Sequence, residues 1–193
     1  MNTPNKLTIA RIIATPVFMA ALMFEFPYHY TVSLVIFALA SLTDMIDGKM
    51  ARKYNLITDF GKFLDPLADK MLTTAAFLGF IKLGIGCQVT WILFIVLFRE
   101  FMVSSLRLVV VSSGGKVIAA NIWGKLKTVT QMAGICTALL AYALIKDFGI
   151  ANALFVGVCD AVISILFWIS AVLCIISGVI YFLACKEYID PSK

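Results

Sequence analysis

The stretch from Asp44 to Asp69 reads DMIDGKMARKYNLITDFGKFLDPLAD. Eight of its residues follow the pattern D-x2-D-G-x2-A-R-x8-G-x3-D-x3-D, and these are Asp44, Asp47, Gly48, Ala51, Arg52, Gly61, Asp65 and Asp69. The chain is 62% hydrophobic and has only 11 acidic residues in all. Carboxylates at membrane depth are costly and usually serve a function. The four carboxylates of this pattern, called the acidic motif below, are therefore the first candidates for a site.

The composition is that of a membrane protein. Charged residues make up 14% of the chain, against about 25% in soluble domains, and the mean hydropathy is +0.99. The sequence predicts an all-α integral membrane bundle that forms one domain over residues 1–193. The net charge is +5, but the basic residues lie between apolar segments. This placement favours lipid headgroups or anionic substrates as partners and argues against nucleic acid.

Six apolar segments are long enough to be transmembrane helices, which need about 20 residues each. They cover residues 7–26, 31–48, 61–83, 89–112, 118–145 and 160–184. The second and third reach this length only if the acidic motif forms their facing ends. With the N-terminus inside, only Lys82 and Lys146 of the 16 basic residues fall on the outer side. The positive-inside rule therefore predicts cytoplasmic termini and an acidic motif that faces the cytoplasm.

Helical spacing brings the motif carboxylates together in pairs. Asp44 and Asp47 are three residues apart, and Asp65 and Asp69 are four apart, so each pair shares one helix face. Two antiparallel helices joined by the polar segment between them would place the pairs face to face. Close carboxylates repel unless a cation neutralises them. Oxygen ligands without His or Cys favour Mg²⁺ or Mn²⁺, which usually serve substrate phosphates.

The remaining motif residues suit a phosphate-bearing ligand. Gly48 and Ala51 let a ligand approach the backbone, and Gly61 leaves the start of the third helix unobstructed. The guanidinium of Arg52 can bind a phosphate with two donors.

The whole pattern resembles the signature of the CDP-alcohol phosphatidyltransferases, with every position filled. These enzymes transfer a phosphatidyl group from CDP-diacylglycerol to an alcohol and release CMP. The resemblance implies a bundle of six membrane helices, a homodimer and a cavity open to the cytoplasm. It also implies that two divalent ions are held by Asp44, Asp47, Asp65 and Asp69, and that Asp69 is the general base as well as a ligand. The alternative role for Asp69 is that of a fourth ligand only. The CDP group would contact Asp44 and Asp47. It would also contact the remaining small and polar residues of this stretch, which are Gly48, Ala51, Arg52, Thr58 and Gly61.

Other blocks resemble the branch of bacterial phosphatidylglycerophosphate synthases, which act in the cell membrane. These blocks are the opening MNTPNKLT, the segment FGKFLDPLADK from Phe60, the pair Arg99-Glu100 and the segment GKLKT from Gly124. The resemblance implies sn-glycerol 3-phosphate as acceptor. Charge and placement give the candidate phosphate-binding residues: Arg107, Lys125 and Lys127, then Thr8, Arg99 and Lys70. Arg99 and Arg107 interrupt the fourth segment, so they are expected to face a polar cavity.

The motif leaves alternatives open. The acceptor in the same chemistry would be phosphatidylglycerol in a cardiolipin synthase, or inositol or inositol phosphate in other relatives. A divalent-cation transporter is a remote alternative, and it predicts acids spread across the bilayer instead of clustered at one face.

Overall fold

The computed structural model describes residues 3–53, 59–114, 122–150 and 152–186, without the side chains of residues 3, 4, 45–53, 59–63, 65, 66 and 69. All regular structure in these residues is helical. The elements are α1 (Thr3–Met23), α2 (His29–Lys53), α3 (Asp59–Leu83), α4 (Val89–Ser112), α5 (Ile122–Tyr142), the short π-helix η1 (Ala143–Asp147) and α6 (Ala153–Ala184). The expected all-α architecture is confirmed for this part of the chain.

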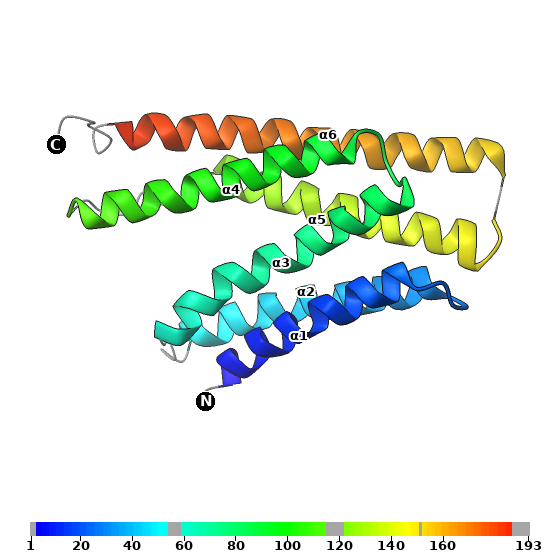
Figure 1. Ribbon diagram of the computed structural model, residues 1–193, viewed down its shortest axis with the longest axis horizontal. Coiled ribbons are helices and arrows are strands. Elements are labelled where there is room, and N and C mark those ends of the chain that lie inside the picture. Colours follow the sequence, from blue (N-terminus) through cyan, green and yellow to red (C-terminus); the bar gives the residue numbers. More distant parts are fainter. Residues whose placement is uncertain (1–2, 54–58, 115–121, 151, 187–193) are drawn as a thin grey trace.

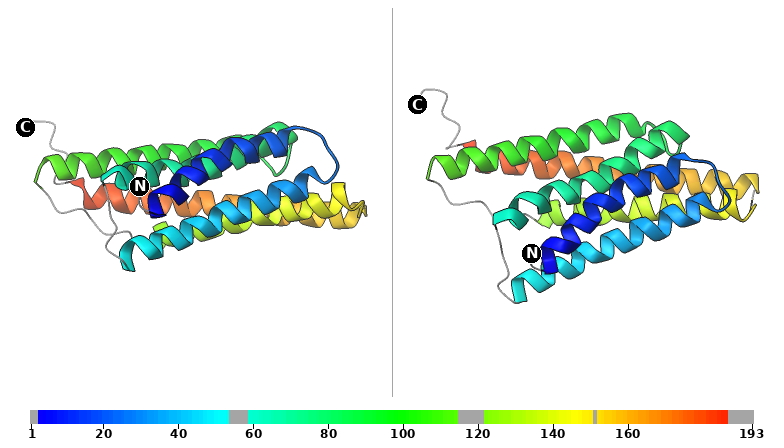
Figure 2. Two further views of the ribbon diagram at one scale, coloured as in Figure 1. Left: turned by 90° about the horizontal axis from the view of Figure 1, so that it is seen from below. Right: turned by 60° about the horizontal axis from the view of Figure 1, so that its bottom comes forward.

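The helices run back and forth along one long axis (Figures 1 and 2). Helix α2 ends and α3 begins at one end of the bundle, called the motif end below, and α1 also begins there (Figure 1). The connections from α1 to α2, from α3 to α4 and from η1 to α6 lie at the opposite, far end (Figure 1). Helix α1 packs against α2 and α3, and α6 packs against α4 and α5. The acidic motif and the ends of α4 and α6 therefore share one end of the molecule.

Among the described residues, three helical segments are long and apolar enough to cross a membrane by themselves: Asn5–Met23, Ile122–Asp147 and Ala153–Ala184. In α2, the described stretch from His29 to Asp44 is apolar as well. Helix α4 carries Arg99, Glu100 and Arg107 within its length. The two arginines that interrupt α4 are residues that the sequence marks as functional. Large apolar side chains such as Ile122 and Leu154, which are 77% and 75% exposed, cover much of the surface. An exposed apolar surface of this kind is expected of a protein whose solvent is lipid.

Aromatic side chains form the centre of the core. Phe77 of α3 and Phe167 of α6 are fully buried, and their ring centroids are 5.0 Å apart. Gly134 of α5 packs against the Phe167 ring, since a Cβ atom on this glycine would stand 2.8 Å from the ring. The glycine lets α5 and α6 approach closely, and the packed rings fix the helices that carry the site.

The predicted segments agree with the helices to within a few residues, except at the start of α6. This helix begins at Ala153 and not near residue 160. The side-chain oxygen of Asn152 accepts a hydrogen bond from the backbone N–H of Leu154, so Asn152 is an N-cap. An Asn before an apolar run is a strong helix-start signal, so the sequence does carry evidence for this earlier start. The correct start lengthens the last helix to 32 residues.

Candidate active site

The backbone places the acidic motif on two helix ends. Asp44 and Asp47 lie in the last turns of α2, and Asp65 and Asp69 lie in the first turns of α3. The side chains of Asp47, Asp65 and Asp69 are outside those described, so the convergence of all four carboxylates stays a prediction. The described side chains contain no cluster of three or more acids, His or Cys that could hold a metal.

Asp44 is held by an arginine that the sequence interpretation did not assign to the site. Nη1 of Arg11 lies 2.5 Å from Oδ1 of Asp44, and the Asp44 side chain is 48% exposed while that of Arg11 is only 2% exposed. A buried charge needs such a partner. The pair joins α1 to α2 at the motif end and fixes one oxygen of the first motif carboxylate.

Arg11 belongs to a buried polar face of α1. Asn5, Thr8, Arg11 and Thr15 are all at most 6% exposed. They follow each other at intervals of three or four residues, so they lie on one side of the helix. Thr8, a predicted phosphate-binding residue, is therefore next to Arg11 on the face that meets Asp44. The polar spacing in an otherwise apolar helix is the sequence signal for this face.

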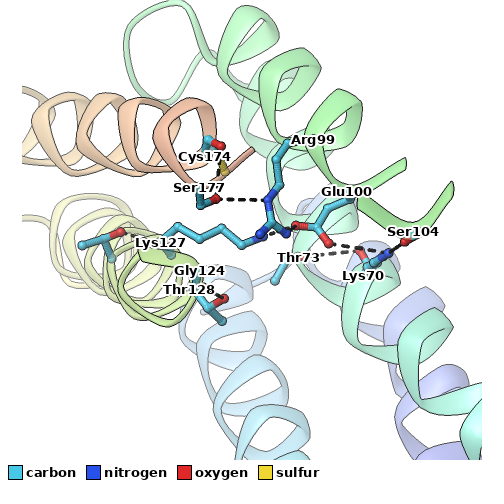
Figure 3. A network of polar contacts seen from close by, with 11 residues as sticks. Lys70, Thr73, Arg99, Glu100, Ser104, Gly124, Lys127, Thr128, Cys174 and Ser177 are labelled. Carbon is cyan, nitrogen blue, oxygen red and sulfur yellow. Dashed lines mark hydrogen bonds and ion pairs between the residues drawn. The ribbon is translucent and has the colours of Figure 1, made fainter. Parts of the chain in front are cut away.

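A second polar group joins three other helices, as Figure 3 shows. We call Lys70 of α3, Arg99 and Glu100 of α4, and Lys127 of α5 the Glu100 cluster. Nζ of Lys127 donates to Oε1 of Glu100, and Nη1 of Arg99 lies 3.1 Å from the same oxygen. Nζ of Lys70 lies 3.5 Å from Oε2. Three predicted phosphate-binding residues are thus brought together, and they meet on a carboxylate that was not predicted as part of the site.

Neighbouring residues hold the cations in place. Nε of Arg99 donates to Oγ of Ser177 in α6 at 3.1 Å, and Nζ of Lys70 contacts Oγ of Ser104 at 2.8 Å. Gly178 makes room for Arg99, because a Cβ atom there would lie 3.2 Å from Cγ of the arginine. The cluster is consequently tied to four helices, α3 to α6.

A small cavity adjoins the cluster. It has a volume of about 30 Å³, and its polar lining includes Lys70, Glu100, Lys127, Thr128 and Gln131. Lys127 and Gln131 are only 7% and 5% exposed. A space of this size holds about one water molecule. The cavity lies between α3, α4 and α5, and its lining also includes the apolar side chains of Val96 and Leu97.

The other predicted residues lie elsewhere or outside the described side chains. Arg107 and Lys125 are exposed, and within the described part of the chain neither forms an ion pair. Helix α5 begins at Ile122, so Lys125 lies in its first turn, as an anion site at a helix start requires. Thr58 lies outside the described residues. Gly48, Ala51, Arg52 and Gly61 have described backbone in α2 and α3, but their surroundings are not described.

Comparisons with known proteins identify the relatives of the chain. The family model for CDP-alcohol phosphatidyltransferase matches residues 1–176. The CDP-diacylglycerol–glycerol-3-phosphate 3-phosphatidyltransferase of Bacillus subtilis is 40% identical over 151 residues, which cover 72% of this chain and 77% of that protein. The protein of the same name in Rickettsia bellii is 40% identical over 191 residues, 97% of each chain. A probable phosphatidylglycerophosphate synthase of Mycobacterium tuberculosis is 42% identical over 137 residues, which cover 69% of this chain and 64% of that protein. The resemblance that the motif indicated is confirmed, and the chain belongs to the CDP-alcohol phosphatidyltransferase family.

Proposed function

We propose that the protein transfers the phosphatidyl group of CDP-diacylglycerol to sn-glycerol 3-phosphate, giving phosphatidylglycerophosphate and CMP in phospholipid biosynthesis. The names of the relatives support this reaction. The observation that carries the proposal is the position of Lys70. It directly follows Asp69, the last carboxylate of the motif, and it is also part of the Glu100 cluster. A phosphate bound by the cluster would thus lie close to the acidic motif.

The proposed membrane arrangement has all six helices crossing the bacterial cell membrane, with the motif end in the cytoplasm. Lys82 lies in the last turn of α3 and Lys146 in η1, both toward the far end of the bundle (Figure 1). These are the two basic residues that the positive-inside rule places outside. CDP-diacylglycerol and glycerol 3-phosphate would reach the site from the cytoplasmic side.

The donor set of the acidic motif fits Mg²⁺ or Mn²⁺. Arg11 binds Oδ1 of Asp44, which leaves the other oxygen of this half-exposed carboxylate for a cation. Asp44, Asp47, Asp65 and Asp69 would hold two ions, since Mg²⁺ and Mn²⁺ prefer oxygen ligands. When bound, the ions would withdraw negative charge from the diphosphate and so stabilise the departing CMP.

The protein residues position the substrates and move one proton. Gly48, Ala51 and Gly61 would give the CDP group access to the backbone, while Arg52 and Thr58 would donate to its phosphates. A hydroxyl oxygen of the acceptor attacks the phosphorus of the phosphatidyl group, and the bond from this phosphorus to the CMP oxygen breaks. Asp69 takes the proton of the hydroxyl as the new bond forms. If Asp69 is only a metal ligand, another base must take this proton.

The Glu100 cluster would bind the phosphate of the acceptor. Lys70, Arg99 and Lys127 offer charged donors, and charge-assisted hydrogen bonds to phosphate are strong. Thr8 would act from the α1 face beside Asp44. Arg107 and Lys125 are exposed, so they would attract the anion from solution more than hold it.

An uncharged acceptor would make no use of the spare donors on Lys70, Arg99 and Lys127, which disfavours inositol. Phosphatidylglycerol and inositol phosphate do carry a phosphate and remain the alternatives within the family. The clustering of the motif acids at one end disfavours the transporter alternative.

We also propose a homodimer, as in the resembling enzymes. Light scattering of the detergent-solubilised protein would measure its mass, and a monomer at all concentrations would argue against the dimer.

The test is the release of CMP by purified protein from CDP-diacylglycerol and Mg²⁺, with each acceptor supplied in turn. We expect release with sn-glycerol 3-phosphate, and little with phosphatidylglycerol, inositol or inositol phosphate. Asp69→Asn should abolish turnover if Asp69 is the base. A faster reaction with another acceptor would reassign the substrate. Metal flux in liposomes without any lipid product would instead support a transporter.

A further inference from the structure

The carboxylate of Glu100 is the common partner of three basic side chains from three helices. Lys70 comes from α3, Arg99 from α4 and Lys127 from α5, and Figure 3 shows them directed at Glu100 from different sides. One carboxylate oxygen accepts from Arg99 and Lys127, and the other faces Lys70. Within the described residues, no other acid pairs with these three cations.

Burial makes this arrangement depend on the carboxylate. The side chains of Lys127, Arg99 and Glu100 are 9%, 14% and 16% exposed, and that of Lys70 is 29% exposed. Like charges repel more strongly when water is excluded. Without an anion among them, three clustered cations would separate. Glu100 supplies that anion in the structure.

The charge of the cluster also matches one class of ligand. Three cations and one carboxylate give a net charge of +2, and a phosphate monoester carries about −1.5 to −2 at pH 7. Each cation keeps N–H donors beyond those used on Glu100, since a lysine has three and an arginine has five. A phosphate can therefore be bound while Glu100 stays in place. Lys70, the most exposed of the three, is the side chain that can move to admit it.

We propose that Glu100 is a positioning residue, which holds Lys70, Arg99 and Lys127 together as a preformed site for the phosphate monoester of the acceptor. This inference rests on the proposed function, because it assigns the cluster to acceptor binding. The competing role is that Glu100 blocks the cations and must be displaced by the substrate. The two roles predict opposite changes in the affinity for the acceptor.

The test compares wild type with Glu100→Gln, which keeps the shape of the side chain and removes its charge. We expect the KM for sn-glycerol 3-phosphate to rise about tenfold or more, because misplaced binding groups are costly. The KM for CDP-diacylglycerol should change little, whereas the thermal midpoint should fall, because three poorly exposed cations lose their carboxylate. Glu100→Asp keeps the charge on a shorter arm and should recover part of the loss. A purely structural role would instead change the KM values of both substrates to a similar extent.

An acceptor KM for Glu100→Gln that is unchanged or lower than that of wild type would overturn the inference. If this variant does not fold, Glu100→Asp decides, because a wild-type KM for the shorter side chain would also overturn it. The outcomes separate the two proposals. A wild-type protein that releases no CMP with sn-glycerol 3-phosphate refutes the proposed function. An active wild type whose acceptor KM does not depend on Glu100 refutes only the positioning role.

Discussion

Lys127 and Lys125 differ by two positions on α5 but lie in different surroundings. Charge alone predicts that both bind the phosphate of the acceptor. In the structure, Lys127 is 7% exposed and donates to Glu100, whereas Lys125 is exposed. Replacing each by Met removes the charge and keeps an unbranched side chain. The pair of variants therefore asks whether the buried cluster or the general positive charge binds the acceptor.

The expected loss follows from the contact that is removed. A hydrogen bond to a charged group contributes about 1.5–3 kcal/mol, which corresponds to about 10- to 150-fold in an equilibrium constant. Lys127→Met should raise the KM for sn-glycerol 3-phosphate by this factor. Glu100 keeps Arg99 and Lys70 as partners, so the variant should still fold. An exposed charge contributes about 0–1 kcal/mol, and Lys125→Met should change the KM by about fivefold at most.

Steady-state release of CMP, measured over a range of sn-glycerol 3-phosphate concentrations at saturating CDP-diacylglycerol, gives both constants. The KM for CDP-diacylglycerol serves as the internal control and should stay near the wild-type value in both variants. Equal effects of the two substitutions would refute the assignment of the buried cluster to the acceptor. A larger effect for Lys125 would move the phosphate site to the start of α5.

Three further predictions concern the motif and the core. Arg11→Met removes the partner that holds Asp44, so it should lower kcat/KM for CDP-diacylglycerol by about 10- to 100-fold, as expected when a partner of a metal ligand is lost. Unchanged kinetics would contradict the role of this pair. Removal of divalent ions with a chelator should abolish CMP release, and added Mg²⁺ or Mn²⁺ should restore it; full activity in the chelator would exclude the metal site. Gly134→Ala should lower the thermal midpoint, since its Cβ would stand 2.8 Å from the Phe167 ring and overpacking costs about 1–3 kcal/mol. Gly157→Ala, where the added Cβ meets nothing within 4 Å, is the matched control, and an equal loss in both variants would refute the packing argument.

The sequence predicted those features that are local in the chain. Helix lengths follow from runs of apolar residues, and the spacing of Asp44 and Asp47 follows from helical periodicity. The family was identified from the motif because its positions are fixed relative to each other. The predicted start of the last helix, near residue 160, is too late, because the side chain of Asn152 caps the helix earlier in the chain.

The sequence did not predict contacts between helices. Neither Arg11 nor Glu100 was among the predicted site residues. Each owes its role to a residue more than 20 positions away, Asp44 for Arg11 and Lys127 for Glu100. Such pairs depend on how the helices pack, and periodicity within one helix does not determine them. The polar face of α1 was nevertheless visible in the sequence as a series of polar residues every three or four positions.

The most direct test of the central claim follows the acceptor phosphate into the lipid. Purified protein is incubated with CDP-diacylglycerol, Mg²⁺ and sn-glycerol 3-phosphate labelled in its phosphate, and both CMP and extracted lipid are measured. The account predicts one labelled phosphate in the lipid for each CMP released, and no such product from Asp69→Asn. Release of CMP without label in the lipid, or equal release with unphosphorylated glycerol, would contradict it.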